Sequence, residues 1–376
     1  MSNDMVPRSL CYAEPGRLTP PPRCRQLHVH NEKGLVRRSI DGCHRCVAHP
    51  NSSVHAYRCF PAIIVIGVMK GGTTELGEQA RHNHPHLHMP NREQHFFGQP
   101  ADSRVLSPVA WHEYLWGART GPSWGSWDIR NGTGLAIEKT PSYFRSPTAL
   151  TNINNLLPSA RLVLLLREPA ARSFSHFRML TAFRHEDASN DAASFHMRTV
   201  PEVRARCAHA ALPELKPCLQ RLHACGEFAS DAACGRIAHK VYQDGPRSIT
   251  HSQGSAASWI ERSIYGNSIR RMYSIGWGCD RVAIIVSEKF KAEPTETLRS
   301  LWKALGVPHN VEISSDHQGR SPGTKQRGHH TQQVEASHDM SNATREVLES
   351  FFRPSVHDVA GLVPALNLKY WWPSYF

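Results

Sequence analysis

The feature that most constrains the fold is an apolar run at residues 60–67 that ends in a glycine-rich turn. The run, FPAIIVIG, is rich in β-branched residues, which is typical of a strand buried on both faces of a parallel sheet. The turn contains KGGTT at residues 70–74, and a helical pattern follows from 75 to about 82. A strand, a glycine turn and a helix in this order direct backbone N–H groups and a helix dipole at an anion. The sequence therefore predicts a phosphate cradle.

Three further apolar runs have the length of strands, at residues 135–139, 161–166 and 281–286. Helical patterns lie between or after them, at residues 169–183, 259–273 and 294–305. Pro169 and Pro294 stand in the first turn of their helices, where proline is tolerated. Strands that alternate with helices predict a parallel α/β sheet with right-handed crossovers. We expect one α/β domain over residues 59–376, with a central parallel sheet, helices on both faces and a P-loop-like cradle.

Two stretches do not follow this pattern. Residues 1–58 are rich in Pro, Arg, His and Cys without periodicity, and we interpret them as a poorly ordered leader or stem. Residues from about 184 to 258 have no clean period, and we interpret them as an insertion outside the core. In an oxidising compartment we expect at least one disulfide among the four cysteines of this insertion. They are Cys207, Cys218, Cys225 and Cys234.

The composition excludes some classes of protein and favours anionic partners. With 40% hydrophobic residues the chain is globular, and no stretch approaches the about 20 apolar residues of a membrane span. The net charge of +12 predicts attraction to polyanions but does not indicate which kind of polyanion.

The first residues lack the apolar core of a secretory signal, so we expect that the protein is cytosolic or that its native N-terminus lies outside this sequence. Glycosylation triplets at Asn51, Asn131 and Asn342 slightly favour the secretory alternative.

A second anion-binding element follows the run at residues 161–166. Arg167 stands at the carboxyl end of this strand, where ligands of α/β sheets bind. Ser175 lies about two helical turns into the next helix, so its hydroxyl and the Arg167 guanidinium can converge on a further phosphate.

The order of residues in the glycine turn argues against a kinase. In residues 70–74 the lysine precedes the glycines, whereas in the Walker motif of kinases it follows them.

These motifs resemble those of sulfotransferases that use 3'-phosphoadenosine 5'-phosphosulfate (PAPS), particularly the carbohydrate sulfotransferases of the Golgi lumen. The resemblance covers about residues 60–355 and implies a 5'-phosphosulfate loop at 70–74 and a 3'-phosphate element at 167–175. Residues 93–97, EQHFF, resemble the segment that carries the catalytic carboxylate of heparan sulfate sulfotransferases. Residues 138–144, EKTPSYF, resemble the substrate-cleft strand. The cysteine-bearing insertion and FFRP at 351–354 are most similar to the chondroitin type, close to the N-acetylgalactosamine 4-sulfate 6-O-sulfotransferase group.

The resemblance implies roles for individual residues. Lys70 would stabilise the leaving phosphate, Glu93 would accept the proton of the acceptor hydroxyl, and Lys139 would polarise the sulfate or bind an acidic sugar. No metal is expected, because a sulfuryl group carries less negative charge than a phosphoryl group. A basic loop with Lys325 and Arg327 would cover the product, adenosine 3',5'-bisphosphate. The expected cofactor-binding residues are Lys70, Gly71, Gly72, Thr73, Thr74, Arg167, Ser175, Lys325 and Arg327.

We therefore expect an enzyme that transfers the sulfuryl group from PAPS to a hydroxyl of a carbohydrate, of the glycosaminoglycan kind. By resemblance it would be a disulfide-bonded glycoprotein of the Golgi lumen or secretory pathway, with its anchor outside this chain and the cytoplasm as alternative. A nucleic acid polymer is not an expected partner, and the oligomeric state is left open. The alternatives are a P-loop small-molecule kinase and a non-catalytic polyanion-binding protein with the same fold. The kinase would need the Walker order and a magnesium-binding aspartate, and the binding protein would not need the full set of site residues.

Overall fold

The computed structural model describes residues 46–48, 57–85, 87–90, 93–98, 114, 135–183, 191–210, 256–278, 280–307 and 339–376. These residues divide into two compact units. The sheet unit comprises the described residues of 46–166 and 271–307, and the helical unit comprises those of 167–270 and 339–376. Each unit is described by itself.

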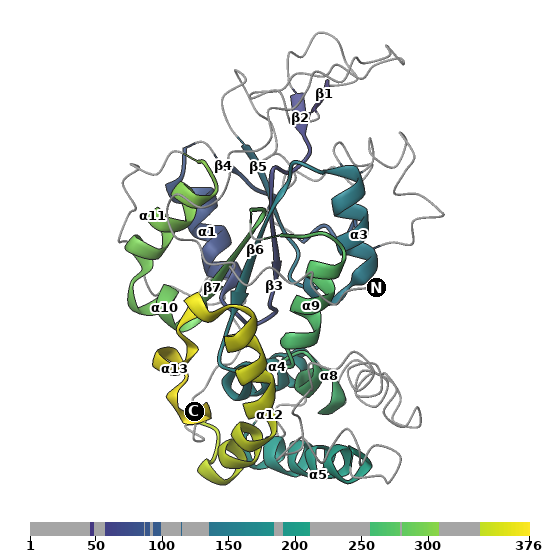
Figure 1. Cartoon of the computed structure of the whole chain (residues 1–376), viewed down its shortest axis with the longest axis vertical. Coiled ribbons are helices and arrows are strands. Elements are labelled where there is room, and N and C mark those ends of the chain that lie inside the picture. Colours follow the sequence, from purple (N-terminus) through teal and green to yellow (C-terminus); the bar gives the residue numbers. More distant parts are fainter. Residues whose placement is uncertain are drawn as a thin grey trace, which may run out of the picture. The chain divides into compact units, whose positions relative to one another are not determined.

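A parallel sheet of five strands organises the described part of the sheet unit (Figure 1). The strand order is β4-β5-β3-β6-β7, and every neighbouring pair is parallel. Every residue of β3, β6 and β7 is buried, which explains the continuous apolar runs of the sequence. The predicted parallel α/β sheet is thus confirmed. The strands are β3 (Ile63–Gly67), β4 (Leu87–His88), β5 (Leu135–Lys139), β6 (Arg161–Leu166) and β7 (Val282–Val286).

Helices cover both faces of this sheet. Figure 1 shows α1 and α11 on one face and α3 on the other. On the first face, Ile63 and Val65 of β3 belong to one buried apolar cluster with Leu76 of α1 and Trp302 of α11. The helices of the unit are α1 (Thr73–Asn83), the short 3-10 helix η3 (Tyr143–Arg145), α3 (Pro147–Leu156), α10 (Ser287–Ala292) and α11 (Pro294–Ala304).

Two adjacent parallel strands end at the same edge of the sheet. Val65 of β3 lies opposite Lys139 of β5, and the N–H of Thr140 donates to the Val65 carbonyl at 3.0 Å. The residues that follow β3, including Lys70, therefore leave the sheet at the edge where β5 ends with Lys139. This edge is where ligands of parallel α/β sheets bind.

The helical unit is built around aromatic contacts and the long helix α12. The Phe177 ring of α4 lies 5.2 Å from the Phe195 ring of α5 and 5.2 Å from the Trp259 ring of α8, between centroids. Helix α12 packs against α4 and α5. The helices are α4 (Pro169–Phe183), α5 (Ala192–Ala210), α8 (Ala256–Glu261), α9 (Gly266–Ser274, whose last residues belong to the sheet unit), α12 (Asn342–Leu362), η8 (Pro364–Leu366), α13 (Leu368–Trp371) and η9 (Pro373–Tyr375).

Part of the insertion expected at 184–258 belongs to the core. Helix α5 lies in this stretch, and its Phe195 is fully buried in the aromatic cluster. The expectation of an insertion outside the core is therefore wrong for α5. Its buried positions do have helical spacing, but Pro201 inside the helix and the exposed Met197 obscure that pattern in the sequence. The expected cysteine bridges are not tested, because Cys218, Cys225 and Cys234 lie outside the described residues.

The helix expected at 259–273 is two helices, α8 and α9, with a break between them. At the break, the Ser263 hydroxyl donates to the Pro169 carbonyl at 3.0 Å, and Tyr265 donates to the Arg167 carbonyl at 2.7 Å. Gly266 then packs so closely on the Asp358 carboxylate that a Cβ would not fit. These contacts come from residues distant in sequence, so the local pattern could not indicate the break.

Short strands also lie outside the main apolar runs of the sequence. Strand β1 (Cys46–Ala48), inside the expected leader, pairs antiparallel with β2 (Tyr57–Cys59); the rest of residues 1–56 lies outside the described residues. In the histidine-rich stretch 82–88, Leu87–His88 form the edge strand β4. His84 is buried, with its ring edge against Trp302.

Candidate functional site

The loop between β3 and α1 has a backbone that requires its glycines. Gly72 has φ 92° and Lys70 has φ 68°, both in the left-handed region that residues with a Cβ rarely adopt. At Gly71 a Cβ would lie 2.8 Å from Val68 Cγ2 and 2.9 Å from the Leu165 carbonyl oxygen. The Val68 N–H also donates to the Leu165 carbonyl at 2.8 Å. The loop is therefore packed directly on β6, and side chains at 71 and 72 would displace it.

The start of α1 leaves backbone donors for an anion. Gly72 is the N-cap residue, and no side chain caps the helix. Thr73 is buried, and Thr74 is exposed at the first turn. Lys70 is half-buried just before the helix. A lysine, two hydroxyls and the N–H groups of a helix start are a donor set suited to a phosphate or phosphosulfate group.

Glu93 and Lys139 lie together at the end of β5. Lys139 Nζ is 3.3 Å from Glu93 Oε1, and His95 Nε2 is 3.4 Å from Glu93 Oε2. The Glu93 side chain is 32% exposed and the Lys139 side chain 13% exposed, so the carboxylate is open to a ligand while the lysine is mostly covered. The structure brings these two predicted catalytic residues together. It adds His95, to which the sequence analysis gave no role although it stands two residues after Glu93.

Helix α1 lies against the stem of Lys139. A Cβ at Gly77 would lie 2.7 Å from Met89 Cε and 3.4 Å from Lys139 Cδ. Met89 Cε therefore occupies the space that a side chain at position 77 would take, while the Lys139 stem lies at ordinary van der Waals distance from that space.

A buried hydrogen-bond network holds the segment that carries Glu93. Glu138 is fully buried; Tyr114 Oη donates to its Oε2, and Thr140 Oγ1 donates to its Oε1 at 2.8 Å. Thr140 Oγ1 in turn accepts the N–H of Gln94 at 3.2 Å. Desolvation by burial raises the pKa of Glu138, although these hydrogen bonds oppose the rise. The residue after Glu93 is thus tied through one hydroxyl to a buried carboxyl group.

The same segment is fixed at a second point, Phe97. This residue is fully buried; its N–H donates to Tyr143 Oη at 3.1 Å, and Asn152 Nδ2 donates to its carbonyl at 2.9 Å. Both ends of residues 94–97 are held, by Thr140 after β5 and by η3 and α3, so the core of the sheet unit sets the positions of Glu93 and His95. Glu138, Thr140 and Tyr143 all belong to the EKTPSYF motif, but the sequence alone did not show that they support Glu93.

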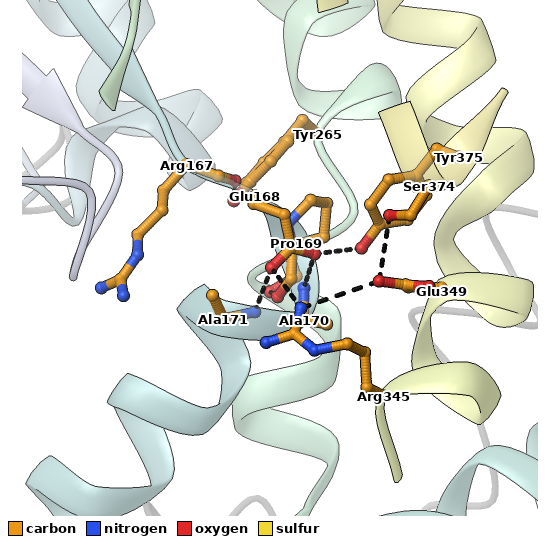
Figure 2. Close-up of polar contacts among 11 residues, drawn as sticks. Arg167, Glu168, Pro169, Ala170, Ala171, Tyr265, Arg345, Glu349, Ser374 and Tyr375 are labelled. Atoms are coloured by element: carbon orange, nitrogen blue, oxygen red, sulfur yellow. Dashed lines mark hydrogen bonds and ion pairs between the residues drawn. The ribbon is translucent and has the colours of Figure 1, made fainter. Parts of the chain in front are cut away.

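In the helical unit, Arg167 and Ser175 are both half-buried. Tyr265 holds the Arg167 carbonyl, and Figure 2 shows the Arg167 side chain extending away from the neighbouring polar cluster. Two residues of the same motif are structural: Arg172 and Ser173 are fully buried and donate to the Trp259 carbonyl. The exposure pattern therefore separates Arg167 and Ser175, which a ligand can reach, from their buried neighbours.

The Glu168 carboxylate accepts hydrogen bonds at the start of α4 (Figure 2). Its Oε1 accepts the Ala170 N–H at 2.8 Å, and its Oε2 accepts the Ala171 N–H at 2.6 Å. Tyr375 Oη donates to Oε1, and Arg345 Nη1 lies 3.6 Å from Oε2. Because Glu168 uses these two N–H groups of the first turn, an anion near Arg167 would have to be bound mainly through side chains.

The predicted site residues belong to two different units. Lys70, Glu93 and Lys139 belong to the sheet unit, whereas Arg167 and Ser175 belong to the helical unit. Lys325 and Arg327 lie outside the described residues. Within the described ranges, no group of three or more His, Cys, Asp or Glu side chains could hold a metal ion.

No family model matches the chain. It is 33% identical over 128 residues to mouse heparan sulfate glucosamine 3-O-sulfotransferase 6, covering 34% of this chain and 33% of that protein. It is 23% identical over 268 residues to the bifunctional heparan sulfate N-deacetylase/N-sulfotransferase 1 of Caenorhabditis briggsae, covering 71% of this chain and 25% of that protein. The chain thus spans a third or less of the length of these relatives. A solved sulfotransferase from Alicyclobacillus acidocaldarius aligns with 82% of this chain and 96% of its own, at 19% identity and TM-score 0.48.

Proposed function

We propose that this protein is an enzyme that transfers the sulfuryl group from PAPS to a hydroxyl of a carbohydrate of the glycosaminoglycan kind. The main support for the proposal is the contact of Glu93 with Lys139. It places a partly exposed carboxylate and a lysine at the edge of the sheet where β3 ends and the glycine loop begins. The similarity to enzymes named for heparan sulfate supports the same reaction class.

The residues of the glycine loop fit the 5'-phosphosulfate end of PAPS. When bound, PAPS would supply an activated sulfuryl group and a phosphate leaving group. The N–H groups at the start of α1 and the Lys70 ammonium would bind the phosphate oxygens and stabilise their negative charge. The tight packing at Gly71 supports this assignment, because it lets the backbone, rather than side chains, face the ligand.

Arg167 and Ser175 would bind the 3'-phosphate. Both are half-buried, and a guanidinium with a hydroxyl suits a phosphate dianion. Lys325 and Arg327 complete the proposed nucleotide site on the strength of the resemblance alone. After transfer, the same residues would retain adenosine 3',5'-bisphosphate until its release.

Glu93 would accept the proton of the acceptor hydroxyl on a carboxylate oxygen. Lys139 and His95 each lie beside one of the two oxygens, so they orient the carboxylate. The hydrogen bond from Gln94 to Thr140 and those at Phe97 keep this orientation without help from the ligand. The segment is thus preorganised for proton acceptance, which lowers the reorganisation needed during the reaction.

The proposed acceptor is an acidic polysaccharide, which the net charge of +12 would attract. The finer assignment to a galactosamine acceptor rests on the cysteine-bearing insertion and on FFRP at 351–354, while the relatives named above are heparan sulfate enzymes. A panel that contains both polymers therefore decides between them.

We propose a location in the secretory pathway, by analogy with the Golgi family that the sequence resembles. Asn342, the first residue of α12, is exposed and available as a glycosylation acceptor. The described helices include none that is long and apolar enough to cross a bilayer.

The direct test is transfer of radiolabelled sulfate from PAPS to a panel of desulfated heparan and chondroitin polymers. We expect labelled product from the wild-type protein and little from Glu93→Gln, which keeps the shape of the side chain and removes the base. Circular dichroism should show that the variant is folded. No transfer to any polymer by wild type, in protein that binds adenosine 3',5'-bisphosphate, would favour the non-catalytic alternative. Phosphoryl transfer from ATP, with none from PAPS, would favour the kinase.

A further inference from the structure

Glu168 stands next to Arg167 in the chain but is held by other groups. Its carboxylate accepts two N–H groups of α4 and the Tyr375 hydroxyl, and Arg345 lies beside it. The Tyr375 ring is fully buried and the Glu168 side chain is 13% exposed. This is a built polar cluster between the start of α4 and the segment 364–376.

Two of the groups that hold Glu168, Tyr375 and Arg345, come from elements distant in sequence. Arg345 belongs to α12 and also pairs with Glu349 at 3.6 Å, while Ser374 Oγ donates to Glu349 at 2.9 Å. Burial raises the pKa of Tyr375 well above its usual value, so the hydroxyl stays protonated and remains a donor. Figure 2 shows the Arg167 side chain pointing away from this cluster.

The Glu168 carboxylate would have another partner if it lost its present contacts. Released from α4 and Tyr375, it could pair with the Arg167 guanidinium or repel a phosphate bound there. Both effects would weaken an anion-binding site at Arg167. The observed contacts prevent this by holding the negative charge on the positive end of α4.

We propose that Tyr375 and Arg345 are positioning residues of the nucleotide site, which hold the Glu168 carboxylate on the first turn of α4 and so keep its charge away from Arg167 and the 3'-phosphate. This inference rests on the proposed function, because it assigns Arg167 to a nucleotide phosphate. Residues about 180 to 210 positions after Arg167 would thus affect nucleotide affinity, although no local sequence motif links them to it.

The experiment is calorimetric titration of the full chain with adenosine 3',5'-bisphosphate. Tyr375→Phe removes only the hydroxyl and should weaken affinity by about fivefold to thirtyfold. Tyr370→Phe is the matched control: Tyr370 is 68% exposed on α13, and the same change there should leave affinity unchanged. Arg345→Met is a second, independent variant expected to weaken affinity in the same direction. In steady-state assays the KM for PAPS should rise while kcat changes little.

A charge rescue distinguishes this role from simple support of the fold. Glu168→Gln removes the charge, so the double variant Tyr375→Phe/Glu168→Gln should recover most of the lost affinity. If Tyr375 acted only by packing, the double variant would bind no better than Tyr375→Phe, and that result would overturn the inference. So would wild-type affinity in both Tyr375→Phe and Arg345→Met. A wild-type protein that fails to bind adenosine 3',5'-bisphosphate would instead refute the proposed function, and this inference with it.

Discussion

Lys139 Nζ lies 3.3 Å from Glu93 Oε1, and this contact joins the end of β5 to a segment 46 residues earlier in the chain. Neither residue is notable alone, since a glutamate in a loop and a lysine at a strand end are common surface residues. Their proximity follows from the hydrogen bond between Gln94 and Thr140, which places the loop beside the strand. The candidate site thus depends on the buried network as much as on its own charges.

Lys70→Ala should lower kcat by about a hundredfold or more, because the lost ammonium would act mainly as the leaving phosphate gains charge. Affinity for adenosine 3',5'-bisphosphate should fall less. Steady-state sulfate transfer and calorimetry measure the two effects. Lys303→Ala, at an exposed position of α11, is the control and should match wild type. Near-normal turnover in Lys70→Ala would remove this lysine from the mechanism.

Arg167→Ala and Ser175→Ala should mainly weaken nucleotide binding, by about tenfold or more for the arginine, because both residues are assigned to the phosphate remote from the reacting sulfur. Isothermal titration with adenosine 3',5'-bisphosphate measures the change. Arg299→Ala, exposed on α11, serves as control. Unchanged affinity in both variants would show that the 3'-phosphate binds elsewhere.

The same substitution should have opposite consequences at two buried threonines. Thr140 Oγ1 donates to Glu138 and accepts from Gln94, so Thr140→Val should cost about 1–3 kcal/mol of unfolding free energy and reduce turnover. Thr297 Oγ1 is buried with no hydrogen-bond partner within the described structure, so Thr297→Val should be neutral or stabilise by up to about 1 kcal/mol. Urea denaturation compares them; equal losses at both positions would contradict the network.

Glu138 should make stability decrease as pH rises. Burial raises its pKa in the folded state, so above the ordinary glutamate pKa the unfolded chain releases the proton first and the folded state still holds it. The contribution is complete below the ordinary value and is lost as pH rises through the raised one. Denaturant unfolding from about pH 4 to pH 8 should therefore show wild type losing stability relative to Glu138→Gln. A difference that grows in favour of wild type would reverse the sign and refute the assignment.

Sulfate transfer from PAPS should survive EDTA. The donors assigned to the phosphosulfate are an ammonium and backbone N–H groups, which supply positive charge without a bound cation. Activity with PAPS and with ATP, each before and after chelation, is the measurement. A chelator-sensitive reaction restored by magnesium would require carboxylate ligands that this assignment lacks.

The strands could be predicted closely, because a strand that is buried on both faces of a sheet is a continuous run of apolar residues in the sequence. The expected strands at 135–139 and 161–166 match β5 and β6, and that at 281–286 begins one residue before β7. The first run begins three residues before β3, where Pro61 cannot donate to the ladder. The break before α9 was missed, because its determinants are contacts with Pro169 and Asp358. Helix α5 was missed, because Pro201 lies inside it and argues against a helix in the sequence.

The site was less accessible to prediction than the fold. The phosphate cradle with Lys70 could be predicted from the order of strand, glycine turn and helix. Glu93 was identified from a resemblance, and its contact with Lys139 was not deducible from spacing. His95 could have been suspected, since it stands two residues from Glu93 in a non-helical segment. Glu168 and Tyr375 leave no such signal, because 207 positions separate the two partners of that hydrogen bond.

Gly77 has a consequence for how this protein could be re-engineered or could diverge. Most exchanges at an interior helix position are mild, and alanine there would ordinarily favour the helix. Here the added methyl group would lie 2.7 Å from Met89 Cε, the movable end of a flexible side chain, and 3.4 Å from Lys139 Cδ, an ordinary van der Waals distance. The adjustment would therefore fall on Met89 and not on the ammonium beside Glu93, so alanine at position 77 should stabilise α1 at no cost in turnover.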